Sequence, residues 1–582
     1  MSSPEVSRDD VRALVRRIVA SPGFAAAESI SRLLEFTVEK TLAGQAGDIK
    51  EFTVGMEVFG RKASFDPQVD SIVRVQARKL RERLLGYYES EGAYDAIRIQ
   101  YRKGSYVPQF LPAATGEVAP MRALAVLPFV NLGPERDYDY LCDGITEELI
   151  FLLSRTPGLR IVSRSSCFAL RAAPDDVRTI GQKLNAQLVV EGTVRQAGDR
   201  IRVTAQLIDT EDGYHLWSER WERGMDRAHV IQDEIAAAIA DALHPRIAQP
   251  APASAPTRDL EAYHLFLKGR YFWNQRTEHG LQRALDHYRA AIARDAGFAR
   301  AWAALADTHV LMAAHQLASP AECMPKAREA ALTALRLDEG LAAAHSALAS
   351  CRMSFDLDSQ GARLEWQRAL DIDPNYAYAW HGLSVFGTIH GQTDDAVRFL
   401  RHAQRLEPLS PAIACDFGFL YYWGRRYPEA VEHCHTALDL HPSFYRTYAP
   451  LARSLTAMGL HSEAIEACLR ARRLFSGRAF LGHVLATLGY CYGRLGQHAE
   501  AVAVLADMHQ IGPPYVSPCD VAIVHAGLQD REAALNSLEE AFRQRAYWLM
   551  GLPRVSLFDG LRAEARFLPL CEAVQVPRLA GS

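Results

Sequence analysis

Five cationic side chains lie close together in the segment "IVRVQARKLRERLLGYY", residues 72–88. The run from Arg74 to Arg83 holds five Arg or Lys residues and a single Glu. A guanidinium can read guanine O6 and N7 in the major groove of DNA, and a lysine binds phosphate as a point charge. Since the solvated face of an ordinary surface helix also carries charge runs, the spacing must decide between the two interpretations.

A helical wheel at about 100° per residue separates this segment into faces. One narrow apolar stripe predicts the buried edge of a helix; it comprises Val73, Ala77, Leu80, Leu84 and Tyr87. The candidate DNA-binding side chains occupy the two flanks. We expect base contacts from Arg74, Arg78 and Arg81 on one flank, an adenine contact from Gln76, and phosphate contacts from Lys79 and Arg83.

The next segment, "IRIQYRKGSYVPQF" at residues 97–110, alternates apolar and polar residues, which predicts a β-hairpin with a basic tip. Arg102 and Lys103 form that tip and are expected to contact phosphates. Two shorter apolar helical patterns, "SRLLEFTVEKTLAG" and "KEFTVGMEVFG", precede the basic helix. The predicted order is therefore helix, helix, basic helix and basic hairpin.

This order resembles the winged helix-turn-helix effector domain of OmpR-type transcription regulators. The segment "VRVQARKLRERL" corresponds to the recognition helix and "YRKGSYV" to the terminal wing. An additional N-terminal helical segment, the long loop "GRKASFDPQVD" and the lack of a receiver domain depart from that pattern. The resemblance implies binding of double-stranded DNA. Residues 1–110 hold 17 Lys and Arg against 15 Asp and Glu, so we expect modest affinity from a monomer and a gain from a homodimer.

The middle of the chain combines strands and helices. Apolar β-runs at 124–129 and 159–163 flank a predicted helix at 140–154. We expect Glu147 and Glu148 to open a helix, where acidic side chains favour its positive end. "QLVVEGTVRQAGDRIRVTAQLIDTEDGYHLWSERWE" predicts antiparallel hairpins, and a helix is expected at 230–243. The phrases "AVLPFVNL", "DGITEELI" and "HLWSERWER" resemble the amino-terminal domain of TolB-like proteins, which implies a sensing, docking or assembly module without catalytic activity.

Three registers of small residues and prolines repeat every 34 residues in the C-terminal half. They are Ala362, Ala396, Ala430 and Ala464; Ala369, Ala403, Ala437 and Ala471; and Pro374, Pro408 and Pro442. The pattern resembles the tetratricopeptide repeat, with roughly eight units over residues 259–552 and a capping tail to about 577. Such helix pairs stack into a superhelix whose concave groove binds proteins or peptides. Four aromatic residues either line that groove or pack between repeats: Trp380, Tyr421, Tyr422 and Tyr448.

Composition and motif searches argue against several other classes of protein. The 582 residues carry a net charge of −4, and the ten cysteines form no CxxC pair. We expect a cytoplasmic protein, since neither a signal peptide nor a membrane-spanning run is visible. No phosphate loop, nucleophile elbow or HExxH motif occurs, so we expect no enzyme, no cofactor and no metal. Cys142 is expected to be a core residue.

The predicted fold class is multi-domain. It comprises a winged helix (α+β) domain at 1–115 with an N-terminal helical extension, a small TolB-like α/β domain at 116–248, a Pro/Ala linker at 249–258 and an all-α tetratricopeptide superhelix at 259–577. This plan is similar to bacterial regulators that activate invasion genes. The leading hypothesis is a transcription regulator. The alternative is a scaffold that binds protein instead of DNA and acts with a signalling enzyme such as an adenylate cyclase.

Overall fold

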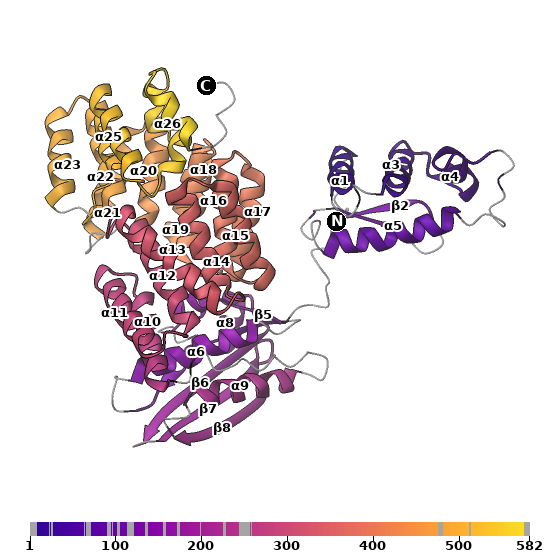
Figure 1. Ribbon diagram of the computed structural model, residues 1–582, viewed down its shortest axis with the longest axis horizontal. Coiled ribbons are helices and arrows are strands. Elements are labelled where there is room, and N and C mark those ends of the chain that lie inside the picture. Colours follow the sequence, from indigo (N-terminus) through magenta and orange to yellow (C-terminus); the bar gives the residue numbers. More distant parts are fainter. Residues whose placement is uncertain are drawn as a thin grey trace. The chain divides into compact units, whose positions relative to one another are not determined.

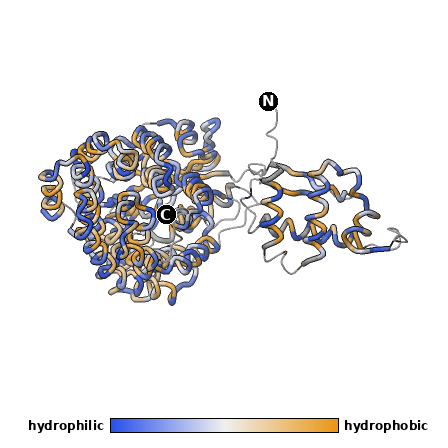
Figure 2. Tube along the Cα trace, turned by 90° about the horizontal axis from the view of Figure 1, so that it is seen from above, coloured by the Kyte–Doolittle hydropathy of each residue, from blue (hydrophilic) through white to orange (hydrophobic). Residues whose placement is uncertain are grey.

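The computed structural model divides the chain into two compact units, Met1–Met121 and Arg122–Ser582, which are described separately (Figure 1). The structure describes residues 8–21, 24, 27–62, 65, 72–89, 95, 97–101, 105–112, 122–133, 138–154, 159–171, 175–197, 200–224, 228–243, 257, 259–474, 481–510 and 514–574. Apolar and polar residues alternate along the helices of both units, as in amphipathic helices that bury one side (Figure 2).

The first unit follows the predicted order of helices and hairpin. Its elements are α1 (Arg8–Ala20), α3 (Glu28–Leu42), η1 (Ala46–Asp48), α4 (Glu51–Glu57), α5 (Ile72–Glu89), β1 (Ile97–Tyr101) and β2 (Pro108–Pro112). β1 pairs antiparallel with β2, with Ile99 opposite Phe110. Asp95 ties three parts of the unit together, because it accepts hydrogen bonds from Tyr87 Oη and Arg17 Nη2, each at 2.8 Å. The buried apolar side chains of these elements form a hydrophobic core that belongs to this unit.

The second unit begins with a mixed sheet. Its strands are β3 (Arg122–Val126), β4 (Val130–Asn131), β5 (Leu159–Ile161), β6 (Leu188–Ala197), β7 (Arg200–Asp209) and β8 (His215–Gly224). The order is β5-β3-β6-β7-β8, with β4 also paired to β6; β5, β3 and β6 run parallel, and β6, β7 and β8 are antiparallel. Gly213 has φ +79° in the turn before β8, as the Asp-Gly sequence predicts.

Helices cover both faces of this sheet. Leu124 and Val126 face a core shared with α6 (Asp139–Ser154) and α9 (Ala228–Leu243). Ala123 and Ala125 face the opposite side, a smaller core with α7 (Arg164–Ala169) and α8 (Val177–Leu184). The alternation follows from the period of two in a strand.

Eight helix pairs follow the sheet within the described residues. They are α10 (Leu260–Asn274) with α11 (Glu278–Arg294), α12 (Ala299–Ala314) with α13 (Pro320–Leu337), α14 (Ala342–Cys351) with α15 (Ser359–Ile372), α16 (Ala377–Ile389) with α17 (Thr393–Leu406), α18 (Pro411–Trp423) with α19 (Tyr427–Leu440), α20 (Tyr448–Ala457) with α21 (His461–Leu474), α22 (Leu481–Arg494) with α23 (His498–Gln510), and α24 (Pro518–Gly527) with α25 (Arg531–Arg543). The alanines of both 34-residue registers are at most 3% exposed, which confirms their predicted role in close helix packing.

The first helices of successive pairs also contact one another, and they form the inner layer of the array. Two distant parts of the array meet on this side. Gln316, after α12, donates from Nε2 to Asp520 Oδ2 on α24 at 2.5 Å, and Tyr515 N donates to Gln316 O at 3.0 Å. The array thus returns on itself.

The sheet region and the repeat array form one unit, whereas the sequence predicted two domains joined by a linker. The helices α6 and α10 pack together, and one hydrophobic core extends from the sheet into the first repeats. Most of the predicted linker, residues 249–258, lies outside the described residues. Among the helices that are described, none combines the length and apolarity that crossing a bilayer requires.

Candidate nucleic-acid interface

The helix α5 buries one edge and exposes the opposite one. Its five predicted core residues are at most 6% exposed: Val73, Ala77, Leu80, Leu84 and Tyr87. This confirms the apolar stripe, which packs against α3, α4 and β1. The prediction succeeded because hydrophobic spacing alone sets which edge of an amphipathic helix is buried.

The outward edge of α5, opposite the apolar stripe, carries Arg78, Lys79 and Arg83, which are all exposed to solvent. Val75 lies among them with 42% of its surface exposed. Val75 was not among the candidates predicted from the sequence, although the same helical wheel places it opposite Val73. Among the described side chains of α5, this edge combines cations with an apolar residue, which offers charge for phosphates and an apolar surface for a thymine methyl group.

The other predicted DNA-binding residues of α5 lie on its flanks and not on the outward edge. Arg74, half exposed, forms an ion pair from Nε to Glu51 Oε1 on α4 at 3.3 Å. Arg81 and Gln76 are half-buried. Burial, reinforced by Glu51 and opposed by the charges of Arg74 and Arg81, raises the pKa of Tyr106 to about 12, so this flank of α5 lies beside the residues that lead into β2. Arg102 and Lys103 lie outside the described residues.

The four aromatic candidates of the array are buried between helices. Trp380, Tyr421, Tyr422 and Tyr448 are 5%, 5%, 0% and 3% exposed. Trp380 donates from Nε1 to Pro374 O at 2.8 Å and packs against the ring of His402, 4.3 Å away. Of the two interpretations that the sequence left open, this geometry agrees with packing between repeats, because little of each ring remains accessible to a ligand.

A buried ionic network joins the sheet region to the array, and sequence reasoning missed it. Glu147 accepts hydrogen bonds from Arg164 Nε at 2.5 Å and Arg270 Nε at 2.7 Å. Arg300 donates to both carboxylate oxygens of Glu148, at 2.6 and 2.7 Å. The expectation that these two acids open a helix was wrong, because both lie inside α6 and pair with arginines of other helices.

The charges within this network determine its protonation state. Burial by itself would raise the pKa of Glu147, but the charges of Arg270 and Arg164 outweigh it and hold the pKa at about 2. Cys142, one turn earlier on α6, is 2% exposed, and burial raises the pKa of its thiol to about 12. It is a core residue, as predicted, and its thiol is uncharged at neutral pH.

Each match to a known protein covers a part of the chain. Residues 121–238 match the family described as HilA/YgeH-like transcriptional regulator, second domain. Among curated proteins, the chain is similar to putative adenylate cyclase 3 of Rhizobium meliloti (strain 1021), with 38% identity over 151 residues. That match covers 25% of this chain and 26% of the relative, so the chain spans about a quarter of the relative's length.

Solved structures with some similarity include a human IFIT1 dimer with m7Gppp-AAAA, 15% identical with a TM-score of 0.39, covering 60% of this chain and 77% of that one. PilF of Pseudomonas aeruginosa is 17% identical with a TM-score of 0.28, covering 38% and 93%. Both TM-scores lie below 0.5. The identifiable family relationship is therefore that of residues 121–238 to the second domain of HilA/YgeH-like transcriptional regulators.

Proposed function

We propose that this chain is a DNA-binding transcription regulator whose first unit is a winged helix-turn-helix domain and whose repeat array receives a protein or peptide signal. The observation that carries the proposal is the outward edge of α5, where Arg78, Lys79 and Val75 are exposed opposite a fully buried apolar stripe. The match of residues 121–238 to a domain of transcriptional regulators supports it.

The side chains on α5 have different roles in this proposal. Arg78 reads a base in the major groove, while Lys79 and Arg83 neutralise phosphates and so fix the register. Arg74 exchanges Glu51 for DNA, since its present ion pair is half exposed and therefore weak. The predicted hairpin tip at Arg102 and Lys103 adds phosphate contacts. The second unit, with a TolB-like sheet region and no catalytic role, acts by docking, in a cytoplasmic protein that binds DNA as a homodimer.

Binding of the full chain to random duplex DNA, measured by fluorescence anisotropy from about 50 to 200 mM salt, tests this proposal. Wild type is expected to show a steep negative slope of log K against log salt. An Arg78→Ala/Lys79→Ala variant removes two charges from the outward edge. We expect the salt dependence of this variant to be less steep by about one, from the lost phosphate contact of Lys79, and its affinity at low salt to fall about 10-fold or more.

Arg16→Ala/Arg32→Ala is the matched control, because it removes the same charge from exposed positions on α1 and α3. It should leave the salt slope close to that of wild type. Equal losses in both double variants would mean that net charge, and not the outward edge of α5, attracts DNA. Absence of binding by folded wild-type protein at about 50 mM salt would overturn the proposal.

The second candidate function is a protein-interaction scaffold that acts with a signalling enzyme in trans. The similarity to a putative adenylate cyclase favours it, because that relative shares a 151-residue region with this chain. In that case the outward edge of α5 contacts an acidic protein surface. The anisotropy experiment separates the two functions, since a scaffold of this kind does not bind random duplex DNA.

A further inference from the structure

The chain continues past α25 into a segment that lies on the inner layer of the array. We call residues 546–561 the strap; it contains the 3₁₀ turns η6 (Leu549–Arg554) and η7 (Ser556–Leu561). η6 contacts α16 and the π-helical turn η4 (Arg352–Asp356), while η7 contacts α20 and α24. The strap is followed by α26 (Phe567–Ala573), which packs on α25. The predicted capping tail therefore crosses several inner helices before it reaches the end of the array.

Polar groups attach the strap to the ends of two inner helices. Arg554 is 6% exposed and donates from Nε to Ile389 O, the last residue of α16, at 2.9 Å. Ser556 Oγ donates to Tyr422 Oη on α18 at 3.2 Å. Asp559 accepts two hydrogen bonds from Arg425, at 2.8 and 2.5 Å. An arginine on a helix C-terminal carbonyl and a two-point carboxylate contact are interactions by which grooves hold extended peptides.

Apolar side chains of the strap fill the inner layer. Leu549, Met550, Leu552 and Phe558 are at most 5% exposed. The ring of Trp548 lies 5.8 Å from that of Trp423 on α18. An aromatic anchor, an apolar turn and an arginine six residues after the anchor thus dock in sequence order, as in a bound peptide.

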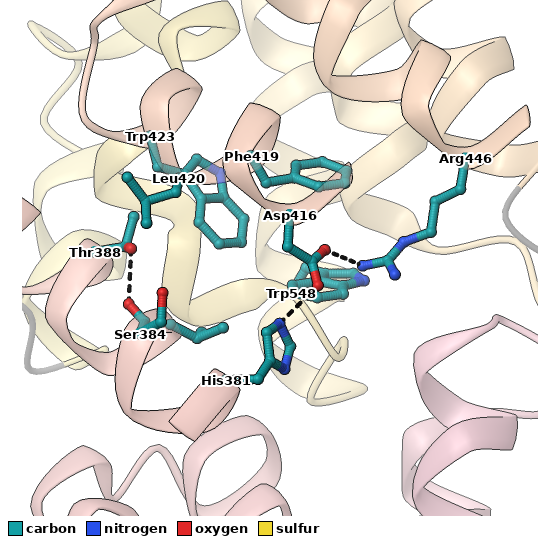
Figure 3. A pocket seen from close by; sticks show the side chains of 10 residues that line it. His381, Ser384, Thr388, Asp416, Phe419, Leu420, Trp423, Arg446 and Trp548 are labelled. Carbon is teal, nitrogen blue, oxygen red and sulfur yellow. Dashed lines mark hydrogen bonds and ion pairs between the residues drawn. The ribbon is translucent and has the colours of Figure 1, made fainter. Parts of the chain in front are cut away.

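The fit around Trp548 is incomplete. The two tryptophans and Asp416 border a cavity of about 20 Å³, also lined by His381 and Arg446 (Figure 3). This volume has room for about one water molecule. Asp416 pairs with His381 Nε2 at 2.8 Å and Arg446 Nη2 at 2.7 Å, which satisfies this carboxylate.

The indole Nε1 atoms of Trp423 and Trp548 are both buried and have no hydrogen-bond partner among the described residues. A buried donor without an acceptor costs stability. A ligand that places a carbonyl or carboxylate oxygen in the cavity would satisfy Trp423, which the strap does not.

We propose that the inner layer is the peptide-binding surface of the array and that the strap occupies it as an intramolecular ligand. The partner is a peptide that adopts turns like those of the strap and presents an aromatic anchor beside a hydrogen-bond acceptor, followed by apolar residues and an arginine. The inference rests on the repeat half of the proposed function and is independent of DNA binding. Partner binding and release of the strap are then one exchange reaction, since both ligands need the same surface.

A peptide supplied in trans tests this exchange. The probe is a fluorescein-labelled synthetic peptide with the sequence of residues 545–561, and the protein is the full chain with a weakened strap, Trp548→Ala/Arg554→Ala. In wild type the tethered strap competes at an effective concentration on the order of millimolar. We therefore expect the double variant to bind the probe at least about 10-fold more tightly than wild type does. Arg543→Ala, an exposed position at the end of α25, is the matched control and should behave as wild type.

The recognition chemistry is checked with a second peptide in which alanine replaces the residues that correspond to Trp548 and Arg554. It should bind the double variant about 10-fold more weakly than the first probe. Equal binding of the two peptides, or a folded double variant that binds the probe no better than wild type, would overturn the inference.

Hydrogen exchange on the wild-type chain gives a readout that does not depend on whether the variant folds. As an exchangeable ligand, the strap should exchange its amide protons faster than α16 and α18. Exchange of strap and inner helices at one common rate would make the strap a permanent part of the core. Intact DNA binding with failed peptide binding would overturn this inference alone, and the reverse result would overturn the DNA half of the proposed function.

Discussion

Val75 differs from its neighbours on the outward edge of α5 because it is apolar and nearly half exposed. Exposed valines are common in proteins, but this one is flanked by cations on a helix that we propose enters the major groove. In that groove the thymine C5-methyl group is the apolar feature of a base pair. Val75 would then contribute to sequence specificity, while Lys79 and Arg83 contribute mainly to affinity.

We predict that Val75→Ala reduces discrimination at one thymine of a duplex selected by this protein. Burial of one methyl group is worth about 0.8 kcal/mol, or roughly 4-fold in affinity. Replacement of that thymine by uracil should weaken DNA binding by wild type about 4-fold and leave the affinity of the Val75→Ala variant almost unchanged. The measurement is anisotropy on a duplex series in which each thymine is replaced singly. If every uracil duplex binds wild type as well as the parent duplex does, Val75 does not read a methyl group.

Glu147 also stabilises the second unit at the scale of a single residue, through its pairs with Arg164 and Arg270. Because its pKa in the folded chain is held at about 2, below its usual value, its ionised form stabilises the fold. This contribution is complete above about pH 4.5 and is lost as the pH falls toward 2. Glu147→Gln should lower the free energy of unfolding at pH 7 by about 3 kcal/mol, because two partly buried arginines lose a charged carboxylate.

The difference between wild type and Glu147→Gln should shrink between about pH 4.5 and pH 3 in urea unfolding experiments. Glu222→Gln is the matched control, since Glu222 also lies between two arginines, Arg200 and Arg202, but is 39% exposed. Its effect should be small, because solvent screens an exposed ion pair. A Glu147→Gln effect as small as that of Glu222→Gln would show that the network contributes little to stability.

At the scale of elements, the contact between α6 and α10 joins the sheet region to the array. Gly144 on α6 makes this approach possible, because a Cβ atom there would lie 2.6 Å from Leu267 Cδ1 on α10. Arg270 on α10 crosses the same contact to pair with Glu147, and Arg300 on α12 pairs with Glu148. A close helix approach and buried ion pairs explain why the two regions form one compact unit.

We predict that Gly144→Val destabilises the second unit by about 1–3 kcal/mol, since the added methyl groups overpack the contact. Leu267→Ala in the same chain should recover part of that loss, because the shorter side chain provides space for the valine. The measurement is a double-mutant cycle from urea unfolding curves. Strictly additive effects of the two substitutions would mean that the two side chains do not share this space.

At the scale of the molecule, the chain consists of two compact units with separate cores. We predict two thermal transitions in calorimetry. Leu80→Ala removes a fully buried side chain from the first unit and should lower the stability of that unit by about 2–5 kcal/mol, leaving the other transition in place. One transition, shifted equally by Leu80→Ala and Gly144→Val, would show that the units unfold together.

Local periodicity in the sequence predicted many secondary-structure elements of this protein and the faces that they bury. The stripe from Val73 to Tyr87, the strands β6, β7 and β8, and the alanines of the repeats were predictable because each depends on spacing within one element or its neighbours. The outward edge of α5 was predictable for its cations, although Val75 was overlooked.

Only the tertiary structure decided what lies on the inner layer. The pairing of Glu147 with Arg270, the meeting of Gln316 with Asp520 and the docking of the strap join residues more than a hundred positions apart. No local pattern specifies such contacts, because they depend on how eight helix pairs curve around a common interior. Sequence thus determined the elements and their buried faces, and the curvature of the array determined which distant side chains meet.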